Sequence, residues 1–205
     1  MGRPREHSRE EFVDAAIRLV DLEGLDALTL RRLGAEVGVS FTAVYTYFSS
    51  REEIITALVD RLSAEIVAAV VATGDSAREQ MIAIATAARS VIERHPRLAP
   101  AFLTSDVPTP GGDAATLAVV GILERSGLEG ADLVRAYRIL EGYVFGTSIF
   151  DVGAAPNHLD IRSRRYRQMQ HRAFRETGKS EKSVAEHNLE SFIHGFELLL
   201  DGLGI

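Results

Sequence analysis

Apolar residues recur along most of the chain at the three- and four-residue spacing of an α-helix. The first clear set lies at Phe12, Ala15, Ala16, Leu19 and Val20, and the spacing places these side chains on one helical face. No apolar–polar alternation continues long enough to predict a β-strand. The pattern therefore predicts an all-α protein.

Capping residues and glycines divide the N-terminal part of this pattern into short helices. Ser8 with Glu11, and Ser50 with Glu53, have the S-x-x-E spacing of a capping box, which opens a helix. The predicted helix starts are Ser8, Thr29, Ser40 and Ser50, and the predicted ends of the first two helices are Gly24 and Gly38. Three short helices therefore fall within about 45 residues, with a turn of about three residues between the second and the third.

The fourth helix is long and leads into a larger helical region. Beyond it, helices are predicted at residues 75–94, 96–104, 112–126, 130–151, 162–177 and 184–202, with turns rich in Pro and Gly between them. We expect a three-helix head over residues 1–50. The fourth helix joins it to a C-terminal helical bundle, which completes a second domain over residues 51–205.

Composition narrows the classes of protein that this pattern could represent. The chain has 205 residues, no cysteine and a formal net charge of −6. Without cysteine, disulfides and thiolate metal sites are excluded. There is no uncharged apolar run of about 18 residues that would predict a membrane span, and the first residues do not resemble a secretory signal. We therefore expect a cytoplasmic protein without a membrane partner.

Charge is also informative about nucleic-acid binding. The net negative charge argues against non-specific coating of nucleic acid. Residues 1–51 hold seven arginines and eight acidic residues, so a nucleic-acid surface here must be a local patch. The segment 40–48 suits such a patch because it combines hydroxyl and aromatic side chains. At about 100° per residue, Val44 and Phe48 share one side of a helix, where they can pack on the first two helices.

The opposite side of this predicted helix carries side chains that suit a DNA major groove. Thr42, Ala43 and Thr46 are small or hydroxyl-bearing and can approach base edges. Tyr45 and Tyr47 flank that face, where their hydroxyls can contact phosphates. With the short turn before it, the helix predicts a helix-turn-helix whose second helix enters the groove.

The stretch LDALTLRRLGAEVGVSFTAVYTYFSSREEIITAL, residues 25–58, resembles the DNA-binding segment of the tetracycline-repressor (TetR-like) family. The likeness extends over about 50 positions as a compound pattern. Its main positions are Phe12, Ala15, Leu28-Thr29-Leu30-Arg31, Gly38-Val39-Ser40, Val44-Tyr45-x-Tyr47-Phe48 and Ser50-Arg51-Glu52. The resemblance implies a homodimer that binds palindromic double-stranded operator DNA. It also implies a transcriptional regulator, most often a repressor, that responds to a small-molecule effector.

The resemblance implies roles for individual residues as well. Phosphate contacts are expected from Thr29, Tyr45, Tyr47 and Arg51. Base-edge contacts are expected from Arg31, Thr42, Ala43 and Thr46. Arg3 and Arg5 resemble basic arms that lie along DNA, here in the minor groove. Ser40 opens the recognition helix, and Phe41 beside it either reads a base or packs against the head.

Past about residue 70 only the architecture of the family carries over. Its last helices form a four-helix interface between subunits, and the apolar stripes suited to that role are Leu133, Tyr137, Leu140, Val144, Leu189, Phe192, Ile193, Phe196 and Leu200. Its central helices enclose a ligand, and the residues expected to line the chamber are Met81, Arg89, Phe102, Leu103, Tyr143, Phe150, His171 and Phe174. Few charges in this set favour a hydrophobic or aromatic ligand. Both sets could also be ordinary core of one subunit.

The main alternative is an all-α small-molecule-binding protein or enzyme whose helix-turn-helix resemblance is incidental. Such an enzyme needs a polar catalytic constellation, and the sequence contains no H-E-x-x-H, G-x-S-x-G, P-loop or G-x-G-x-x-G motif. His187, Glu190 and His194 share one helical face, but a solvated or interface face explains them better than a metal site. We therefore expect no catalytic residues, no metal and no cofactor.

Overall fold

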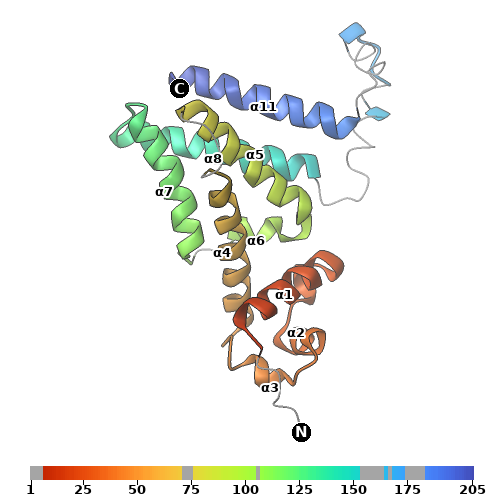
Figure 1. The fold of residues 1–205 in the computed structure, drawn as a ribbon. Helices are drawn as coiled ribbons and strands as arrows, with labels where there is room; N and C mark the ends of the chain where they lie inside the picture. The colour runs from red at the N-terminus through yellow and green to blue at the C-terminus, as the bar shows by residue number, and fades with distance from the viewer. Residues whose placement is uncertain (1–6, 71–75, 105–106, 153–163, 166–167, 174–182) are drawn as a thin grey trace. The chain divides into compact units, whose positions relative to one another are not determined.

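The computed structural model describes residues 7–70, 76–104, 107–152, 164–165, 168–173 and 183–205. Within these ranges every regular element is helical, which confirms the predicted all-α class (Figure 1). The elements are α1 (Arg9–Glu23), η1 (Leu25–Ala27), α2 (Leu30–Val37), α3 (Phe41–Val44), α4 (Arg51–Val70), α5 (Ala77–Arg94), η2 (Pro96–Leu98), α6 (Ala99–Thr104), α7 (Pro110–Arg125), α8 (Gly130–Val152) and α11 (Val184–Leu203). Half of the helix predicted at 162–177 lies outside the described residues, and within the described half residues 169–171 are not helical, so a continuous helix over this range is not confirmed.

The chain divides into two compact units, and each is described by itself. The first unit comprises Met1–Ala68 and Arg97–Leu117, and the second comprises Ala69–Pro96 and Ala118–Ile205. Most of α4, together with α6 and the start of α7, thus groups with the N-terminal helices. The compact units therefore differ from the domains predicted at residues 1–50 and 51–205, and the division of function between those domains stays a prediction.

Predicted caps set the helix ends in the first unit. The hydroxyls of Ser8, Thr29 and Ser40 each accept a hydrogen bond from the backbone N–H three residues further on, at N–O distances of 3.2, 3.1 and 3.3 Å. Gly24 and Gly38 follow α1 and α2 at φ angles of 93° and 83°, where a side chain would be strained. These predicted helix starts and ends are confirmed.

The apolar faces of the N-terminal helices meet in one core. Its fully buried side chains include Phe12, Leu19, Leu28, Leu33, Val44, Phe48, Ile54 and Leu58. Gly34 lets α2 and α3 approach closely, because a Cβ there would stand 3.1 Å from the carbonyl oxygen of Val39 and 3.2 Å from Cγ2 of Val44. The position of α3 on α2 is therefore fixed by close packing.

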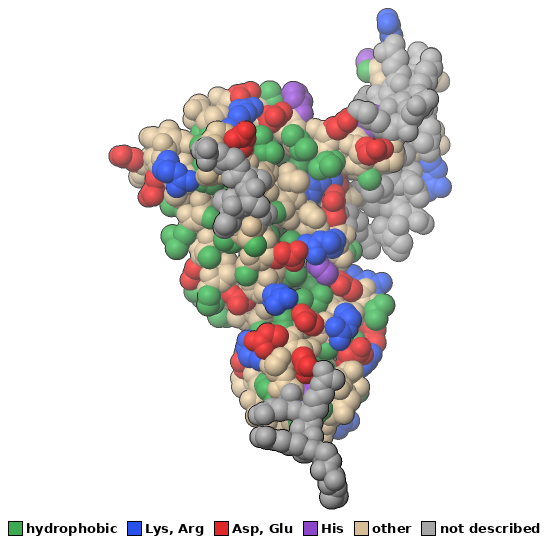
Figure 2. Space-filling view, in the orientation of Figure 1, with side chains coloured by type: hydrophobic (Ala, Val, Ile, Leu, Met, Phe, Trp, Pro, Cys, Tyr) green, Lys and Arg blue, Asp and Glu red, His purple; other side chains and the backbone are tan. Residues whose placement is uncertain are grey.

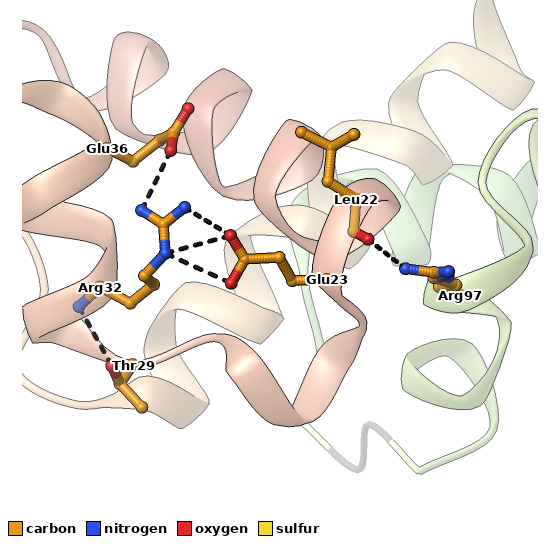
Figure 3. Close-up of polar contacts among 6 residues, drawn as sticks. All are labelled: Leu22, Glu23, Thr29, Arg32, Glu36 and Arg97. Atoms are coloured by element: carbon orange, nitrogen blue, oxygen red, sulfur yellow. Dashed lines mark hydrogen bonds and ion pairs between the residues drawn. The ribbon is translucent and has the colours of Figure 1, made fainter.

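Two hydrogen bonds tie the returning segment 97–117 to the N-terminal helices of the same unit. The Arg97 guanidinium donates to the backbone carbonyl of Leu22, near the end of α1 (Figure 3). At the start of α7, the backbone N–H of Gly111 donates to Oδ1 of Asp60 in α4, at 2.6 Å. The three-helix head therefore shares its unit with a segment that the sequence pattern assigned to the bundle.

The second unit is built around α5, α8 and α11. Its buried apolar side chains include Met81, Ile84, Val91, Ile92, Leu140, Val144, Phe192, Phe196 and Leu200. Arg89 of α5 is only 2% exposed among them. Its Nη1 lies 2.9 Å from Oδ2 of Asp151, its Nε lies 2.8 Å from Oε1 of Glu93, and its Cζ lies 4.9 Å from the centre of the Phe192 ring. These carboxylates and the ring compensate the buried cation for lost hydration.

Two negative findings apply to the described residues alone. No helix among them combines the length and the apolarity needed to cross a membrane. No cluster of three or more His, Asp or Glu side chains in the same ranges is arranged to hold a metal ion, and this includes the face with His187, Glu190 and His194.

Candidate nucleic-acid interface

The recognition helix starts as predicted but is shorter than predicted. Ser40 caps it, and regular α-helix extends only over Phe41–Val44. The chain then tightens, since Thr46 N–H bonds to the carbonyl of Ala43 at 3.2 Å and Tyr47 N–H bonds to that of Val44 at 2.9 Å. Bonds between residues i and i+3 belong to a 3₁₀ turn, which rotates successive side chains by about 120° instead of about 100°.

The turn of α3 separates a buried side from an exposed side. Val44 and Phe48 are fully buried, in agreement with the predicted packing side. The exposed side carries Phe41, Thr42, Tyr45 and Thr46, with Ala43 half-buried between them. The hydroxyls of Ser40 and Thr42 lie 2.9 Å apart in a hydrogen bond, which orients the first turn of the helix. A compact surface of hydroxyl and aromatic groups therefore stands on a rigid base.

Tyr47 points away from this surface. Its hydroxyl donates to the backbone carbonyl of His7 at 2.6 Å, and its ring centre lies 4.6 Å from that of Phe12 in α1. The predicted position of Tyr47 on the flank of the exposed face is therefore corrected. Because its hydroxyl donates to His7, Tyr47 fixes α3 against the N-terminus of α1, and its expected phosphate contact stays a prediction.

Arg51, at the start of α4, also binds inside the unit. Its Nε donates to the carbonyl of Leu28 at 2.8 Å and its Nη2 donates to the carbonyl of Leu25 at 2.9 Å. Both acceptors lie in the turn between α1 and α2. Arg51 therefore clamps the turn that leads into α2, and its expected phosphate contact stays a prediction.

Thr29 is exposed at the N-terminus of α2, and an ion-pair cluster holds this end of the helix in place (Figure 3). The Arg32 guanidinium bonds to both carboxylate oxygens of Glu23 at the end of α1, and its Nη1 lies 3.1 Å from Oε2 of Glu36. The hydrogen bond from Arg32 lowers the pKa of Glu23, and the hydrogen bond to Glu23 raises the pKa of Arg32. The cluster therefore fixes where the Thr29 hydroxyl is presented.

Arg31 differs from its neighbour because it is exposed and not committed to an acid. Among the described residues it makes no ion pair; its Cζ instead lies 5.8 Å from the centre of the Phe41 ring. On the face shown in Figure 2, acidic and basic side chains are interspersed without a large patch of one sign. Arg31 therefore supplies an available positive charge beside the exposed side of α3, in agreement with its predicted position.

Sequence reasoning missed part of the support beneath this surface. Glu53 of α4 accepts from the backbone N–H of Ser49 at 2.7 Å and from its hydroxyl at 2.8 Å, and its other oxygen lies 3.2 Å from the Arg9 guanidinium. The Ser49 bonds, backbone first, and then Arg9 lower the pKa of Glu53. The S-x-x-E spacing correctly indicated Ser50, whose hydroxyl accepts the Glu53 backbone N–H at 3.1 Å. Only the fold reveals Ser49 and Arg9 as partners of the Glu53 carboxylate. Arg3 and Arg5 lie outside the described residues.

The residues predicted to line a ligand chamber occur in both units. In the second unit, Met81 and Arg89 are buried, Tyr143 is half-buried, and Phe150 and His171 are exposed. In the first unit, Phe102 is half-buried and Leu103 is exposed, whereas Phe174 lies outside the described residues. The Tyr143 hydroxyl donates to the carbonyl of Phe192 at 3.0 Å, and burial raises the pKa of Tyr143. A chamber lined by these residues stays a prediction.

The predicted dimer stripes are partly used inside the chain. Leu140, Val144, Phe192, Phe196 and Leu200 are buried within the second unit of the single chain, so their part in an interface between subunits stays a prediction. The physical reason is that one apolar stripe can face a helix of its own chain as readily as a partner. At least part of the side chain is accessible at Leu133, Tyr137, Leu189 and Ile193.

Two family profiles together match most of the chain. Residues 12–58 match the profile of bacterial regulatory proteins of the tetR family, and residues 72–204 match that of the tetracyclin repressor-like C-terminal domain. The chain belongs to the tetR family. The resemblance of the helix-turn-helix segment is therefore confirmed, and because the family consists of regulatory proteins, the enzyme alternative is set aside.

Individual proteins show the same likeness. The chain is 27% identical over 139 residues to the HTH-type transcriptional repressor DrrR1 of Streptomyces coeruleorubidus. The aligned region covers 68% of this chain and 52%, or about half, of DrrR1. It resembles the structure of a possible TetR family transcriptional regulator from Streptomyces coelicolor A3(2), with a TM-score of 0.75, 26% identity and coverage of 96% of this chain and 98% of that chain. It shares its fold with Streptomyces coelicolor ActR in complex with actinorhodin, with a TM-score of 0.70, 19% identity and coverage of 97% of both chains.

Proposed function

We propose that this tetR-family chain is a sequence-specific DNA-binding transcriptional regulator, a repressor that a small hydrophobic or aromatic ligand releases from its operator. The observation that carries the proposal is the two-sided α3, with Val44 and Phe48 fully buried and Thr42, Tyr45 and Thr46 exposed. A helix that enters a DNA groove needs a buried side that fixes its position and an exposed side that contacts the DNA, because side chains discriminate between bases only when they are held in a defined place.

The exposed residues suit the parts of a major groove. Thr42 and Thr46 present hydroxyls and methyl groups to base edges, and the Tyr45 hydroxyl can reach a phosphate. Arg31 adds a cation that makes no ion pair among the described residues. Thr29 presents a hydroxyl at the N-terminus of α2, where the helix dipole favours an anion. A role on chromosomal DNA agrees with the cytoplasmic location that the sequence predicts.

Homodimerisation and a palindromic operator form part of the same proposal. A two-fold symmetric protein presents two recognition helices, which fit half-sites about 34–36 Å apart. Apolar side chains that remain exposed on α8 and α11, Val134, Ile139, Leu189 and Leu198, are available for an interface. Leu133, Tyr137 and Ile193 from the predicted set can extend it.

Ligand control is supported by the fold and by contacts within the first unit. The same fold in ActR is known in complex with actinorhodin. In this chain, Arg97 bonds to Leu22 of α1, and Asp60 of α4 bonds to Gly111 of α7. A ligand that favours another position of the 97–117 segment would therefore act directly on the helices that carry α3, by its differential affinity for the two states.

Selection of bound sequences from a random duplex pool tests the DNA-binding proposal. We expect a palindromic site, and log affinity that falls linearly with log salt because phosphates are neutralised on binding. Arg31→Ala should reduce affinity for the selected duplex, whereas Arg18→Ala removes the same charge from an exposed position on α1 and should not. A lack of enrichment in the selected pool would contradict the proposal.

The dimer and the ligand need separate measurements on the same protein. Light scattering should give a mass of two chains for the free protein and of two chains per duplex for its complex. A panel of hydrophobic and aromatic compounds is then screened for release of a fluorescent operator. If the protein binds its operator and no compound of these classes releases it, DNA binding stands and ligand release is contradicted.

A further inference from the structure

An aromatic and cationic cluster stands on the exposed side of α3 beside the hydroxyl residues. The Phe41 and Tyr45 rings meet edge to face, with centres 6.1 Å apart and planes at 74°. Arg31 of the neighbouring helix α2 places its Cζ 5.8 Å from the Phe41 ring centre. Phe41 is 45% exposed and Tyr45 is 54% exposed. Phe41 therefore lies outside the core, and part of its ring is accessible to a partner.

The backbone beneath Phe41 is held rigidly although its ring is exposed. Ser40 caps the helix immediately before it. A Cβ on Gly34 of α2 would stand 3.4 Å from the Phe41 Cα, so the two helices are in close contact at this point. An exposed phenylalanine on a fixed backbone, braced by Arg31 and Tyr45, presents an apolar surface in a defined direction.

On the proposed DNA-binding function, that surface needs an apolar partner in the major groove. The edges of the base pairs there are hydrogen-bond donors and acceptors, with one apolar group, the C5-methyl of thymine. A ring that displaces water from this methyl gains by apolar burial, whereas a ring against the other edges leaves polar groups without partners. We propose that Phe41 is a specificity residue that contacts a thymine methyl group in each operator half-site, with Arg31 and Tyr45 as the residues that position its ring.

The test removes only the methyl group from the DNA. In the operator obtained by selection, each thymine is replaced in turn by deoxyuridine at symmetric positions of the two half-sites. Burial of one methyl corresponds to about a fourfold change in affinity, so we expect wild-type protein to lose about fourfold per half-site at one position. Phe41→Ala should bind the thymine operator more weakly and should show no further loss at that position.

Controls separate Phe41 from the two threonines, whose methyl groups can also contact thymine. Thr42→Ala and Thr46→Ala should still lose affinity when deoxyuridine replaces the thymine assigned to Phe41. Their losses at other thymine positions should differ from those of the wild-type protein. Phe41→Leu retains an apolar side chain and should retain part of the effect. Circular dichroism during urea unfolding checks that Phe41→Ala remains folded, and if it does not, Phe41→Leu and Phe41→Met carry the comparison.

Several outcomes would overturn the inference and leave the proposed function intact. The wild-type protein could bind its operator with no loss at any uracil position, or Phe41→Ala could show the same uracil loss as wild type. The inference would also be overturned if the base pair at which Phe41→Ala changes affinity contained no thymine. Failure to select any operator is different, because it removes the proposed function and this inference together.

Discussion

Asp60 and Gly111 join α4 to α7 through both backbone and side chain. Oδ1 of Asp60 accepts the Gly111 N–H at 2.6 Å, and a Cβ on Gly111 would overlap the backbone carbonyl oxygen of Asp60. The carboxylate thus caps the start of α7, at a distance between the two helices that only glycine permits. Both residues lie in the first unit, which also contains α3.

Gly111→Ala should therefore destabilise the protein, by about 1–3 kcal/mol, because the new methyl group meets backbone that cannot move aside independently. Urea unfolding followed by circular dichroism measures the change. Gly121→Ala is the matched control in the same helix, because the nearest atom to its Cβ is the end of the Arg125 side chain at 3.4 Å. It should be stabilising by about 0.5–1 kcal/mol, since alanine is the better helix former. Equal effects of the two variants would contradict the close approach of α4 and α7.

Tyr45 and Tyr47 should separate DNA affinity from stability. Tyr47→Phe removes the bond to the His7 carbonyl and should lower the free energy of unfolding by about 1 kcal/mol. Tyr45→Phe removes an exposed hydroxyl and should leave stability unchanged while weakening operator binding across sequences. Urea unfolding and fluorescence anisotropy with the selected duplex measure the two quantities. The reverse assignment, with Tyr45 affecting stability and Tyr47 only affinity, would show that the two rings are placed incorrectly.

The elements predicted correctly are those that depend on local sequence. Caps at Thr29 and Ser40, the stop at Gly38 and the buried side at Val44 and Phe48 need only neighbouring residues and the helical period. Tyr47 could not be placed this way. The tight turn after Val44 changes the rotation per residue, and its partner His7 lies 40 positions earlier in the chain.

The same limit applies to residues whose partners are distant in sequence. The acceptors of Arg51 lie 23 and 26 positions away. Of the two acid partners of Arg89, Glu93 lies four positions away but Asp151 lies 62 positions away, so spacing along the chain does not reveal Asp151. The stripes on α8 and α11 were recognised as apolar, but their pattern does not distinguish contact with α5 from contact with another subunit. What the period shows is which residues share a face, and the fold decides what the face meets.

Arg51 should matter for stability more than its place in the first turn of a helix suggests. Arg51→Ala loses two charge-assisted hydrogen bonds and should cost roughly 1–3 kcal/mol. Arg51→Lys keeps the charge, but an ammonium group cannot reproduce the spacing of the two guanidinium donors, so rescue should be partial. Hydrogen exchange of residues 24–30, measured by mass spectrometry, should increase in both variants. Unchanged protection there, combined with reduced DNA affinity, would contradict the structural role and favour the phosphate contact expected from the sequence.

Glu53 should contribute stability that depends on pH in the acid range. Its pKa in the folded chain is lowered from the ordinary value of 4.5, first by the Ser49 backbone N–H, then by the Ser49 hydroxyl and Arg9. Because the folded state favours the ionised carboxylate, this contribution is fully present above about pH 4.5 and is lost as the pH falls through the lowered pKa. Glu53→Gln should therefore be less stable than wild type at pH 7, and the difference should narrow below about pH 4.5.

Urea unfolding at pH 7, 5, 4 and 3 measures this narrowing. Glu52→Gln removes the same charge from the same helical turn without touching the Ser49 hydrogen bonds, so narrowing shared by both variants is a general effect of charge. Arg9→Gln removes the contributions that follow those of Ser49 and should reproduce only part of the Glu53→Gln effect, because the Ser49 donors remain. Glu53→Gln could instead be equally destabilised from pH 7 to pH 3. That result would show that the Ser49 and Arg9 donors do not stabilise the ionised carboxylate, and that the turn between α3 and α4, which supports Phe48, is fixed by apolar packing.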